Sequence, residues 1–284
     1  MNPVRDKDLE NPGRPKGGVS NGMKDTRIIM GMPIEIEITG ENPEKALEAA
    51  FAYLVAVDER FSTYKENSEI SRINRELGHS NILENVGMSE EMREVFTIGE
   101  ETRSKTNGYF DIRRPDGSID PSGVVKGWAI FNTAKLIRDN LAARHPSNLG
   151  VSPPIGYFVN AGGDIAMNGK DAEGKEWSVG IRNPFNVNEI VKVVYPHGKG
   201  VATSGSYIRG DHIYNPHKPG EKIKEIVSIT VIGPDVLAAD LMATAAFAMG
   251  KEGITFIEQL PGFEGYVIDA NGIATMTSGF GVYA

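Results

Sequence analysis

Hydrophobic and polar residues along the chain follow two periods. Between Ile28 and Thr39 the run Pro-Ile-Glu-Ile-Glu-Ile-Thr alternates with a period of two, which predicts a strand with one buried face. Asn42-Pro43 then supplies an N-cap and a proline at the first helical position. Large apolar residues recur at helical spacing from there to Phe61, so a long amphipathic helix is predicted after the strand.

Two more helices are expected before the pattern changes. Ser89 opens one that stops at Asn107-Gly108, and another runs from about Gly123 to Ala143. Short β-rich runs dominate after Gly156, and they cover residues 157–159, 177–181, 190–194, 200–202 and 226–232. Helices over 234–249 and 253–259 and strands over 265–268 and 273–276 complete the prediction. This order predicts an α+β fold in a single domain of one or two lobes, with mixed or antiparallel sheets and flanking helices.

Composition narrows the class of protein. The chain has 284 residues, of which 40% are hydrophobic, and a net charge of -8 without a basic stripe, so nucleic acid is not expected as a partner. Without any cysteine, a metal here must be bound by oxygen or imidazole ligands.

Residues 1–24 are polar and predict a flexible tail before a folded domain over 25–284. No segment is apolar enough to span a membrane or serve as a signal peptide, so we expect a soluble protein, cytoplasmic as given or exported after signal removal.

One helix carries a pair of oxygen ligands. Asp240 and Thr244 stand four residues apart in an otherwise apolar helix, so their side chains share one face. A carboxylate and a hydroxyl, completed by a backbone carbonyl and phosphate oxygens, suit octahedral Mg²⁺. Capping or backbone hydrogen bonding is the structural alternative, and for the pair alone it is the commoner one.

Two glycine-containing segments are candidate ligand-binding turns. Residues 160–164, Asn-Ala-Gly-Gly-Asp, lie between two apolar strands, and they suit either a plain hairpin or a close approach of the backbone to a ligand. Residues 120–127, Asp-Pro-Ser-Gly-Val-Val-Lys-Gly, open a helix and offer N–H donors and a lysine to an anion. An ordinary N-cap explains the second segment equally well.

A fourth segment combines serines with an aspartate and a histidine. Thr203-Ser204-Gly205 leads to Asp211-His212, and a serine hydrolase is the first class that this combination suggests. No G-x-S-x-G elbow is present, and an adjacent Asp and His cannot be assumed to orient each other. A hydrolase triad is therefore not favoured.

Together and in order, these segments from about Ile28 to the C-terminus resemble the ApbE family of flavin transferases. The segments that match family motifs are Met30-Gly31-Met32-Pro33, Phe61-Ser62-Thr63-Tyr64 followed by Ser68-Glu69-Ile70-Ser71 and Asn74, Asn107 to Asp111, Asp120 to Gly127, Val159 to Asp164, Ala202 to Pro216, and Asp240 with Thr244. Three features depart from the family pattern: only residues 112–119 separate the third motif from the fourth, Pro121-Ser122 replaces Leu-Gly, and Met32 replaces a threonine.

The resemblance assigns roles to particular positions. It implies that FAD contacts Met30, Tyr64, Tyr109, Phe110, Asp111, Asp120, Lys126 and Ile213, with Gly162, Gly163 and Asp164 lining the same pocket. It also implies that Asp240, Thr244 and the backbone carbonyl of Gly123 hold Mg²⁺, and that His212 is the base that activates an acceptor hydroxyl.

On this resemblance we expect a Mg²⁺-dependent FAD:protein FMN transferase. Such an enzyme cleaves FAD, attaches FMN through a phosphoester bond to a threonine or serine of an acceptor protein such as a redox subunit, and releases AMP. A metal on the pyrophosphate and an imidazole that removes the acceptor's proton are both recognised contributions to phosphoryl transfer. Two alternatives stay open, an FAD pyrophosphatase that yields AMP and FMN and a non-catalytic FAD-binding protein.

Overall fold

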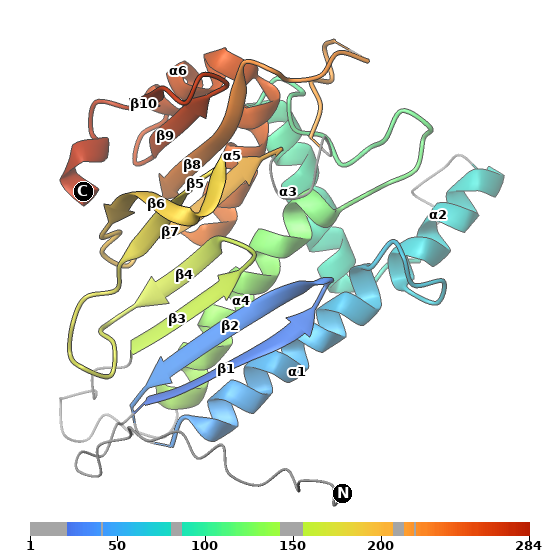
Figure 1. Ribbon diagram of the computed structural model, residues 1–284. Coiled ribbons are helices and arrows are strands. Elements are labelled where there is room, and N and C mark those ends of the chain that lie inside the picture. Colours follow the sequence, from blue (N-terminus) through green and yellow to red (C-terminus); the bar gives the residue numbers. More distant parts are fainter. Residues whose placement is uncertain (1–21, 41, 81–86, 143–155, 207–212, 219) are drawn as a thin grey trace, which may run out of the picture.

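An eight-stranded antiparallel sheet runs through the centre of the computed structural model (Figure 1). The structure describes residues 22–40, 42–80, 87–142, 156–206, 213–218 and 220–284. In spatial order the sheet contains β1 (Gly22–Ile29), β2 (Met32–Thr39), β3 (Gly156–Ala161), β4 (Asp164–Asn168), β7 (Gly200–Gly205), β8 (Ile226–Gly233), β9 (Glu264–Asp269) and β10 (Ala274–Met276). A separate two-stranded sheet is formed by β5 (Val179–Asn183) and β6 (Asn186–Val194). The predicted α+β class with antiparallel sheets is confirmed.

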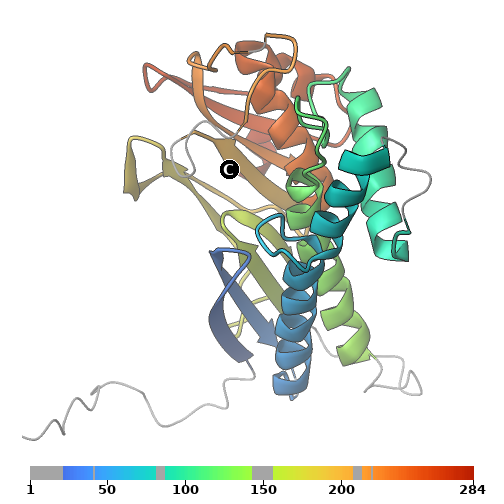
Figure 2. The same ribbon diagram turned by 90° about the vertical axis from the view of Figure 1, so that its right-hand side faces the viewer.

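Helices cover one face of the large sheet. The described helices are α1 (Glu44–Phe61), α2 (Glu69–Ser80), α3 (Glu90–Lys105), α4 (Ser122–Ala142), α5 (Val236–Ala248) and α6 (Gly253–Glu258), with 3-10 turns η2 (Gly250–Glu252) and η3 (Phe280–Tyr283). Helices α1 and α4 lie side by side along the sheet, and α5 packs against α4 and against β7 and β8 (Figure 2). The period of two in β2 has its expected effect, because Ile34, Ile36 and Ile38 are all buried in this core.

The hairpin β5–β6 covers part of the opposite face of the sheet. Val201 and Ile232 point to that face, and their neighbours Ala202 and Val231 point to the helices. Val179, Ile181 and Val194 of the hairpin pack against Val201 and Ile232 in a second, smaller core cluster. The hairpin is therefore anchored to the sheet through these three residues.

The first predicted strand was wrong in one respect. Residues 28–39 are not one strand, because the chain reverses at Met30-Gly31, where φ is +52° and +71°, and β1 and β2 form a hairpin. β1 begins at Gly22, so residues 22–24 of the predicted tail belong to the sheet, and residues 1–21 lie outside the described residues. The N-cap of α1 is Pro43, not Asn42.

Other predicted elements agree with the structure to within a few residues. The helices expected from Ser89 and from Gly123 correspond to α3 and α4, and Ser89 caps α3 by accepting a hydrogen bond from Met92 N. Helix α2 was not predicted from the sequence. Among the described helices, none has the length and apolarity that a bilayer span requires.

Candidate active site

Almost all of the predicted site residues line one large cavity of about 1670 Å³. It is lined by Met30, Tyr64, Tyr109, Phe110, Asp111, Asp120, Gly123, Lys126, Gly162, Gly163, Ile213, Asp240 and Thr244. Asp164 lies directly behind this lining, where it contacts Lys126. His212 lies outside the described residues. The volume exceeds that of common small-ligand pockets and is sufficient for a dinucleotide.

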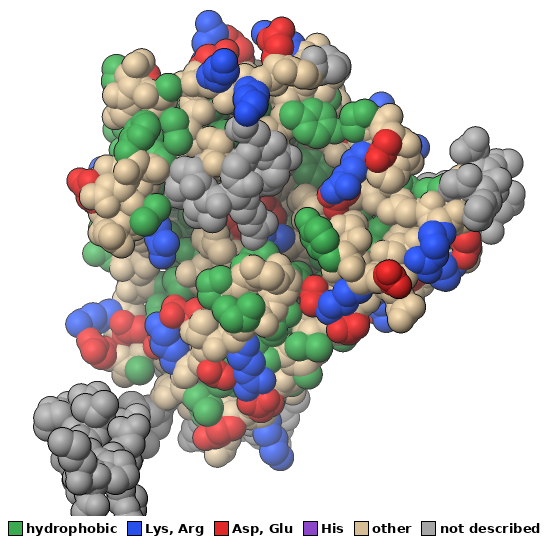
Figure 3. All heavy atoms as spheres, turned by 45° about the vertical axis from the view of Figure 1, so that its right-hand side comes forward, with side chains coloured by type: hydrophobic (Ala, Val, Ile, Leu, Met, Phe, Trp, Pro, Cys, Tyr) green, Lys and Arg blue, Asp and Glu red, His purple; other side chains and the backbone are tan. Residues whose placement is uncertain are grey.

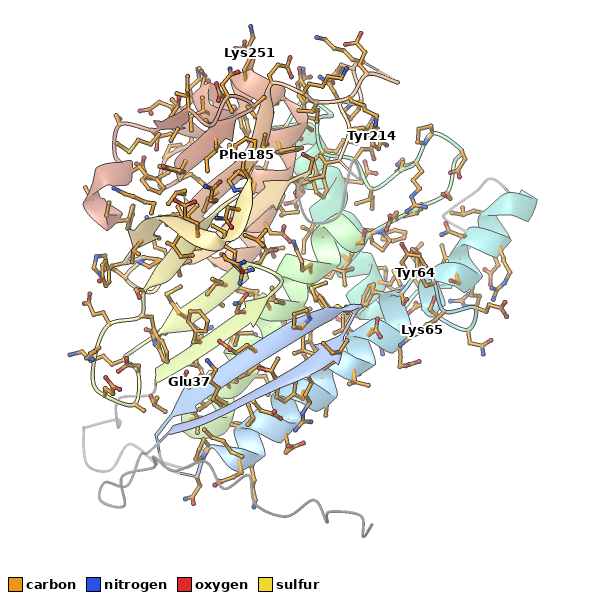
Figure 4. All side chains as sticks on the ribbon, viewed as in Figure 1. Glu37, Tyr64, Lys65, Phe185, Tyr214 and Lys251 are labelled. Carbon is orange, nitrogen blue, oxygen red and sulfur yellow. The ribbon has the colours of Figure 1, made fainter. Side chains whose placement is uncertain are left out.

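The cavity lies between segments that are far apart in the sequence. Tyr64 and Lys65 are at the loop after α1, whereas Tyr214 approaches from the segment that precedes β8 (Figure 4). The surface is hollowed near the middle of the face shown in Figure 3, and acidic and basic side chains are interspersed around it. The site is thus assembled by the tertiary fold and not by one contiguous motif.

A buried cluster of three charged side chains forms the floor of the cavity. Lys126 Nζ, from the first turns of α4, lies 2.5 Å from Asp164 Oδ2 and 3.4 Å from Asp240 Oδ1. Asp164 is 0% exposed and Asp240 is 2% exposed. Burial and the neighbouring Asp164 carboxylate raise the pKa of Asp240 to about 8, although Lys126 opposes the shift. One ammonium therefore faces two buried acids, and this single positive charge is too little to keep both of them ionised at neutral pH.

Backbone hydrogen bonds hold the two carboxylates in place. Gly127 N donates to Asp240 Oδ2 at 3.0 Å, and Thr203 N of β7 donates to Asp164 Oδ1 at 3.2 Å. A Cβ on Gly127 would lie 3.0 Å from Asp240 and 3.1 Å from Leu237 Cα, so glycine allows α4 and α5 to approach closely. This contact explains the glycine that ends the 120–127 segment, and it links the helix start to Asp240.

The donor set on the floor fits a hard divalent cation. Asp240, Thr244 and Gly123 all border the cavity, and Thr244 Oγ1 lies 3.4 Å from Ser204 Oγ of β7. A cation beside Asp240 would supply the positive charge that the floor lacks. Among the described residues no group of three or more His, Cys, Asp or Glu side chains is arranged to hold a metal.

The glycine pair at 162–163 forms a hairpin turn that also borders the cavity. Ala161 pairs with Asp164, so the loop between β3 and β4 consists of two residues, with φ of +64° and +102°. Positive φ at both positions suits glycine, and Asn160 Oδ1 accepts a hydrogen bond from Gly163 N at 3.0 Å. A Cβ on Gly163 would meet no atom within 4 Å. The turn thus leaves open space beside the floor and places Asp164 at the first position of β4.

The segment after α3 forms the rim of the cavity. Asn107 has a positive φ of +51°, and the turn that it makes with Gly108 brings Tyr109 to Asp111 to the cavity wall. Asp111 Oδ2 lies 2.9 Å from Arg103 Nε. The ring of His217 packs against Tyr109 at 4.5 Å between centroids, and its Nε2 lies 2.9 Å from the Asn107 carbonyl oxygen. Two anchors on different elements therefore fix this wall.

The short segment 112–119 is a closed loop. Arg114 N donates to the Ser118 carbonyl at 2.8 Å, and an isolated bridge joins Arg113 to Ile119. Asn74 of α2 clamps the loop, because its amide donates to the Ile119 carbonyl at 2.9 Å and its Oδ1 accepts from Ile119 N at 2.8 Å. The structural role of Asn74 explains why it accompanies the Ser-Glu-Ile-Ser motif.

Some lining residues were missed by the sequence analysis. Arg114, Arg182 and Tyr214 border the cavity, and Arg114 forms an ion pair with Asp120. Tyr214 follows the predicted base in the motif and could have been included on that ground. Arg182 carries no local signal in the sequence, since it becomes a lining residue only when the β5–β6 hairpin folds onto the sheet.

The class of protein follows from comparison with known sequences. The model of the ApbE family matches residues 30–114 and 113–267, which together cover most of the chain. The chain therefore belongs to the ApbE family. It is similar to proteins named FAD:protein FMN transferase. It is 24% identical to the protein of that name from Salmonella typhimurium over 306 residues, and the alignment covers 86% of this chain and 83% of that protein. It is 30% identical to that of Klebsiella pneumoniae over 167 residues, covering 56% of this chain but only 44% of that protein.

Solved structures share the fold. The ApbE protein from Thermotoga maritima superposes with a TM-score of 0.78 at 21% identity, covering 92% of this chain and 99% of that one. The flavin transferase ApbE from Vibrio cholerae superposes with a TM-score of 0.73 at 20% identity, covering 93% and 99% respectively. The predicted family fold is confirmed.

Proposed function

We propose that this chain is a Mg²⁺-dependent transferase that moves FMN from FAD to a threonine or serine hydroxyl of an acceptor protein and releases AMP. The observation that carries the proposal is the buried Lys126–Asp164–Asp240 cluster at the floor of a dinucleotide-sized cavity. The names of the similar proteins of known sequence support the same activity.

The floor residues would orient the pyrophosphate. Asp240, Thr244 and the Gly123 carbonyl would hold Mg²⁺, which when bound neutralises charge on the phosphate oxygens. Asp164 keeps the Lys126 ammonium beside Asp240, so that a positive charge stays close to the carboxylate when the cavity is empty. Burial of both acids strengthens these interactions, because they act in a medium of lower dielectric constant than water.

The rim residues would bind the rest of FAD. Tyr64 is 95% exposed, so its side chain is free to move onto a ring of FAD. Tyr109 is held in place by its contact with His217. Asp111 and Asp120 offer carboxylate oxygens to ribityl or adenine donors, and their ion pairs with Arg103 and Arg114 keep them in position.

The transfer step itself requires a base. We assign this role to His212 on the family motif, since Ile213, the next residue, lines the cavity. The acceptor oxygen would attack the phosphorus of the FMN half, its proton would pass to the imidazole, and the bond from that phosphorus to the AMP oxygen would break. A positioned imidazole typically contributes about 10²–10⁴-fold to such a step.

Incubation of the purified chain with FAD, Mg²⁺ and candidate redox subunits tests the proposal. We expect a flavin-fluorescent acceptor band that survives denaturing electrophoresis, together with stoichiometric AMP. His212→Ala should retain FAD binding and lose the band, and His197→Ala, a histidine outside the cavity lining, is the matched control. Release of AMP and free FMN without a labelled acceptor would indicate a pyrophosphatase, and intact FAD would indicate binding alone.

A further inference from the structure

Among the described residues that line the cavity four are basic, and three of these are already paired with acids of the same chain. Lys65 Nζ lies 2.6 Å from Asp58 Oδ2 and 2.7 Å from Glu59 Oε1. Arg114 pairs with Asp120, and Lys126 pairs with the two acids of the floor. The fourth, Arg182, forms no ion pair with any residue that the structure describes.

Arg182 lies on the β5–β6 hairpin and borders the cavity. Ile181 is buried in the second core cluster, whereas Arg182, the next residue of β5, is exposed. The register between β5 and β6 shifts on both sides of Arg182. Such irregularities bend a strand and re-aim a side chain, and they are common beside functional sites. The hairpin therefore fixes the backbone of Arg182 while its guanidinium remains available.

The nearest acid on the same hairpin has another partner. Glu189 precedes Ile190, which pairs with Arg182 in the ladder, but its Oε2 accepts a hydrogen bond from Asn183 Nδ2 at 2.8 Å. Asn183 Oδ1 in turn accepts from Phe185 N at 2.9 Å and closes the hairpin turn. These hydrogen bonds engage the Glu189 carboxylate at the turn, on the residue that follows Arg182.

The cavity needs such a cation if it is to bind an anionic nucleotide. Its lining includes the acids Glu35, Asp58, Asp111, Asp120 and Asp240, and the whole chain carries a net charge of -8. FAD is negatively charged at neutral pH only at its two phosphates. The planar guanidinium fork is well suited to phosphate oxygens, with which it forms charge-assisted, often bidentate hydrogen bonds.

We infer that Arg182 binds a phosphate of the FAD pyrophosphate from the hairpin side of the cavity. The inference rests on the proposed function and adds to it a specificity-determining residue outside the family motifs identified in the sequence. The Arg182 guanidinium can give its positive charge to the nucleotide phosphates. The Lys126 ammonium on the floor, in contrast, is shared with Asp164 and Asp240. The hairpin thereby contributes to substrate recognition as well as to the second core cluster.

Titration of FAD into the parent, Arg182→Gln and Arg182→Lys proteins, with Mg²⁺ present, tests the inference. Arg182→Gln should raise the FAD dissociation constant roughly tenfold or more, because a charge-assisted hydrogen bond is lost, and Arg182→Lys should lie between it and the parent. Riboflavin, which has no phosphate, should bind all three proteins equally. Lys192→Gln, on the same hairpin but outside the cavity lining, is the matched control and should bind FAD within twofold of the parent.

The outcomes separate this inference from the proposed function. FAD affinity of Arg182→Gln within twofold of the parent, or an equal loss for FAD and riboflavin, would overturn the role of Arg182. Unchanged FAD affinity with a raised KM for the acceptor protein would also overturn it, because the guanidinium would then serve the acceptor. A parent protein that binds no FAD would instead refute the proposed function.

Discussion

The floor and the rim of the cavity are built from different kinds of contact. On the floor, Asp164 and Asp240 are almost completely buried, and backbone N–H groups of β7 and α4 donate to them. At the rim, Tyr64 is 95% exposed and the acids are held by arginine side chains that are about half exposed. The floor is therefore fixed by the packing of helices on the sheet, and the rim by contacts that compete with water.

This difference predicts different effects of substitutions on the floor and at the rim. A buried charged cluster is costly to build and loses several kcal/mol when one partner is removed, on the order of 3–5 kcal/mol. Exposed ion pairs contribute only about 0–1 kcal/mol each. Substitutions on the floor should therefore abolish chemistry, whereas substitutions at the rim should change affinity gradually.

The largest effect is expected from Asp240→Ala. We predict a loss of roughly 10²–10³-fold in the rate of FMN transfer, because the only carboxylate of the floor that lines the cavity directly is removed. Asp235→Ala on the same helix is the control. Asp235 caps α5 by accepting from Ala238 N at 2.8 Å, so its loss should cost about 1 kcal/mol of stability and leave the transfer rate unchanged. Equal rates for Asp240→Ala and the parent would remove the floor from the mechanism.

An intermediate effect is expected from Asn74→Ala. Its two hydrogen bonds to Ile119 join α2 to the loop that carries Arg114, so the free energy of unfolding should fall by about 1–3 kcal/mol. Affinity for FAD should fall several-fold, since the loosened loop contains Arg114, which pairs with Asp120. Urea denaturation and FAD titration measure the two effects. Asn271→Ala, in the exposed β9–β10 turn, should change neither, and an Asn74→Ala protein that matches it would show that the clamp is dispensable.

The smallest effect is expected from Tyr64→Ala. An exposed aromatic that covers a ring contributes roughly 0.5–1.5 kcal/mol, so the FAD dissociation constant should rise about two- to tenfold while the melting temperature stays the same. The maximal transfer rate should not change, because Tyr64 makes no contact with the floor cluster. A loss of transfer rate as large as that of Asp240→Ala would show that rim and floor are not distinct.

Local signals in the sequence were sufficient for most of the fold, but on the floor they related only Asp240 to Thr244. The period of two in β2 and the capping serine of α3 act within a few residues, and the i, i+4 spacing of Asp240 and Thr244 fixes their shared helix face. The family motifs predicted that residues 120–127 and 160–164 belong to one site, although no local sequence signal relates the two segments. The assigned ligand roles of these residues stay predictions.

The parts that could not be predicted depend on long-range packing. The turn at Met30 requires a positive φ in a non-glycine residue, which period-two alternation does not reveal. Arg182 joins the cavity only through the docking of its hairpin on Val201 and Ile232. The polar helix α2 is held by Glu69, whose carboxylate accepts from Ser89 N and Ser89 Oγ at the start of α3, and by Asn74.

The central claim is that a metal and the FAD pyrophosphate meet at Asp240. The most direct test measures FAD affinity of the parent and of Asp240→Asn with saturating Mg²⁺ and with a chelator. Because two ligands that share a site must affect each other's binding equally, we predict that Mg²⁺ tightens FAD binding by about tenfold or more in the parent and has almost no effect in the variant. FAD affinity in the parent that is the same with Mg²⁺ and with chelator would contradict the account.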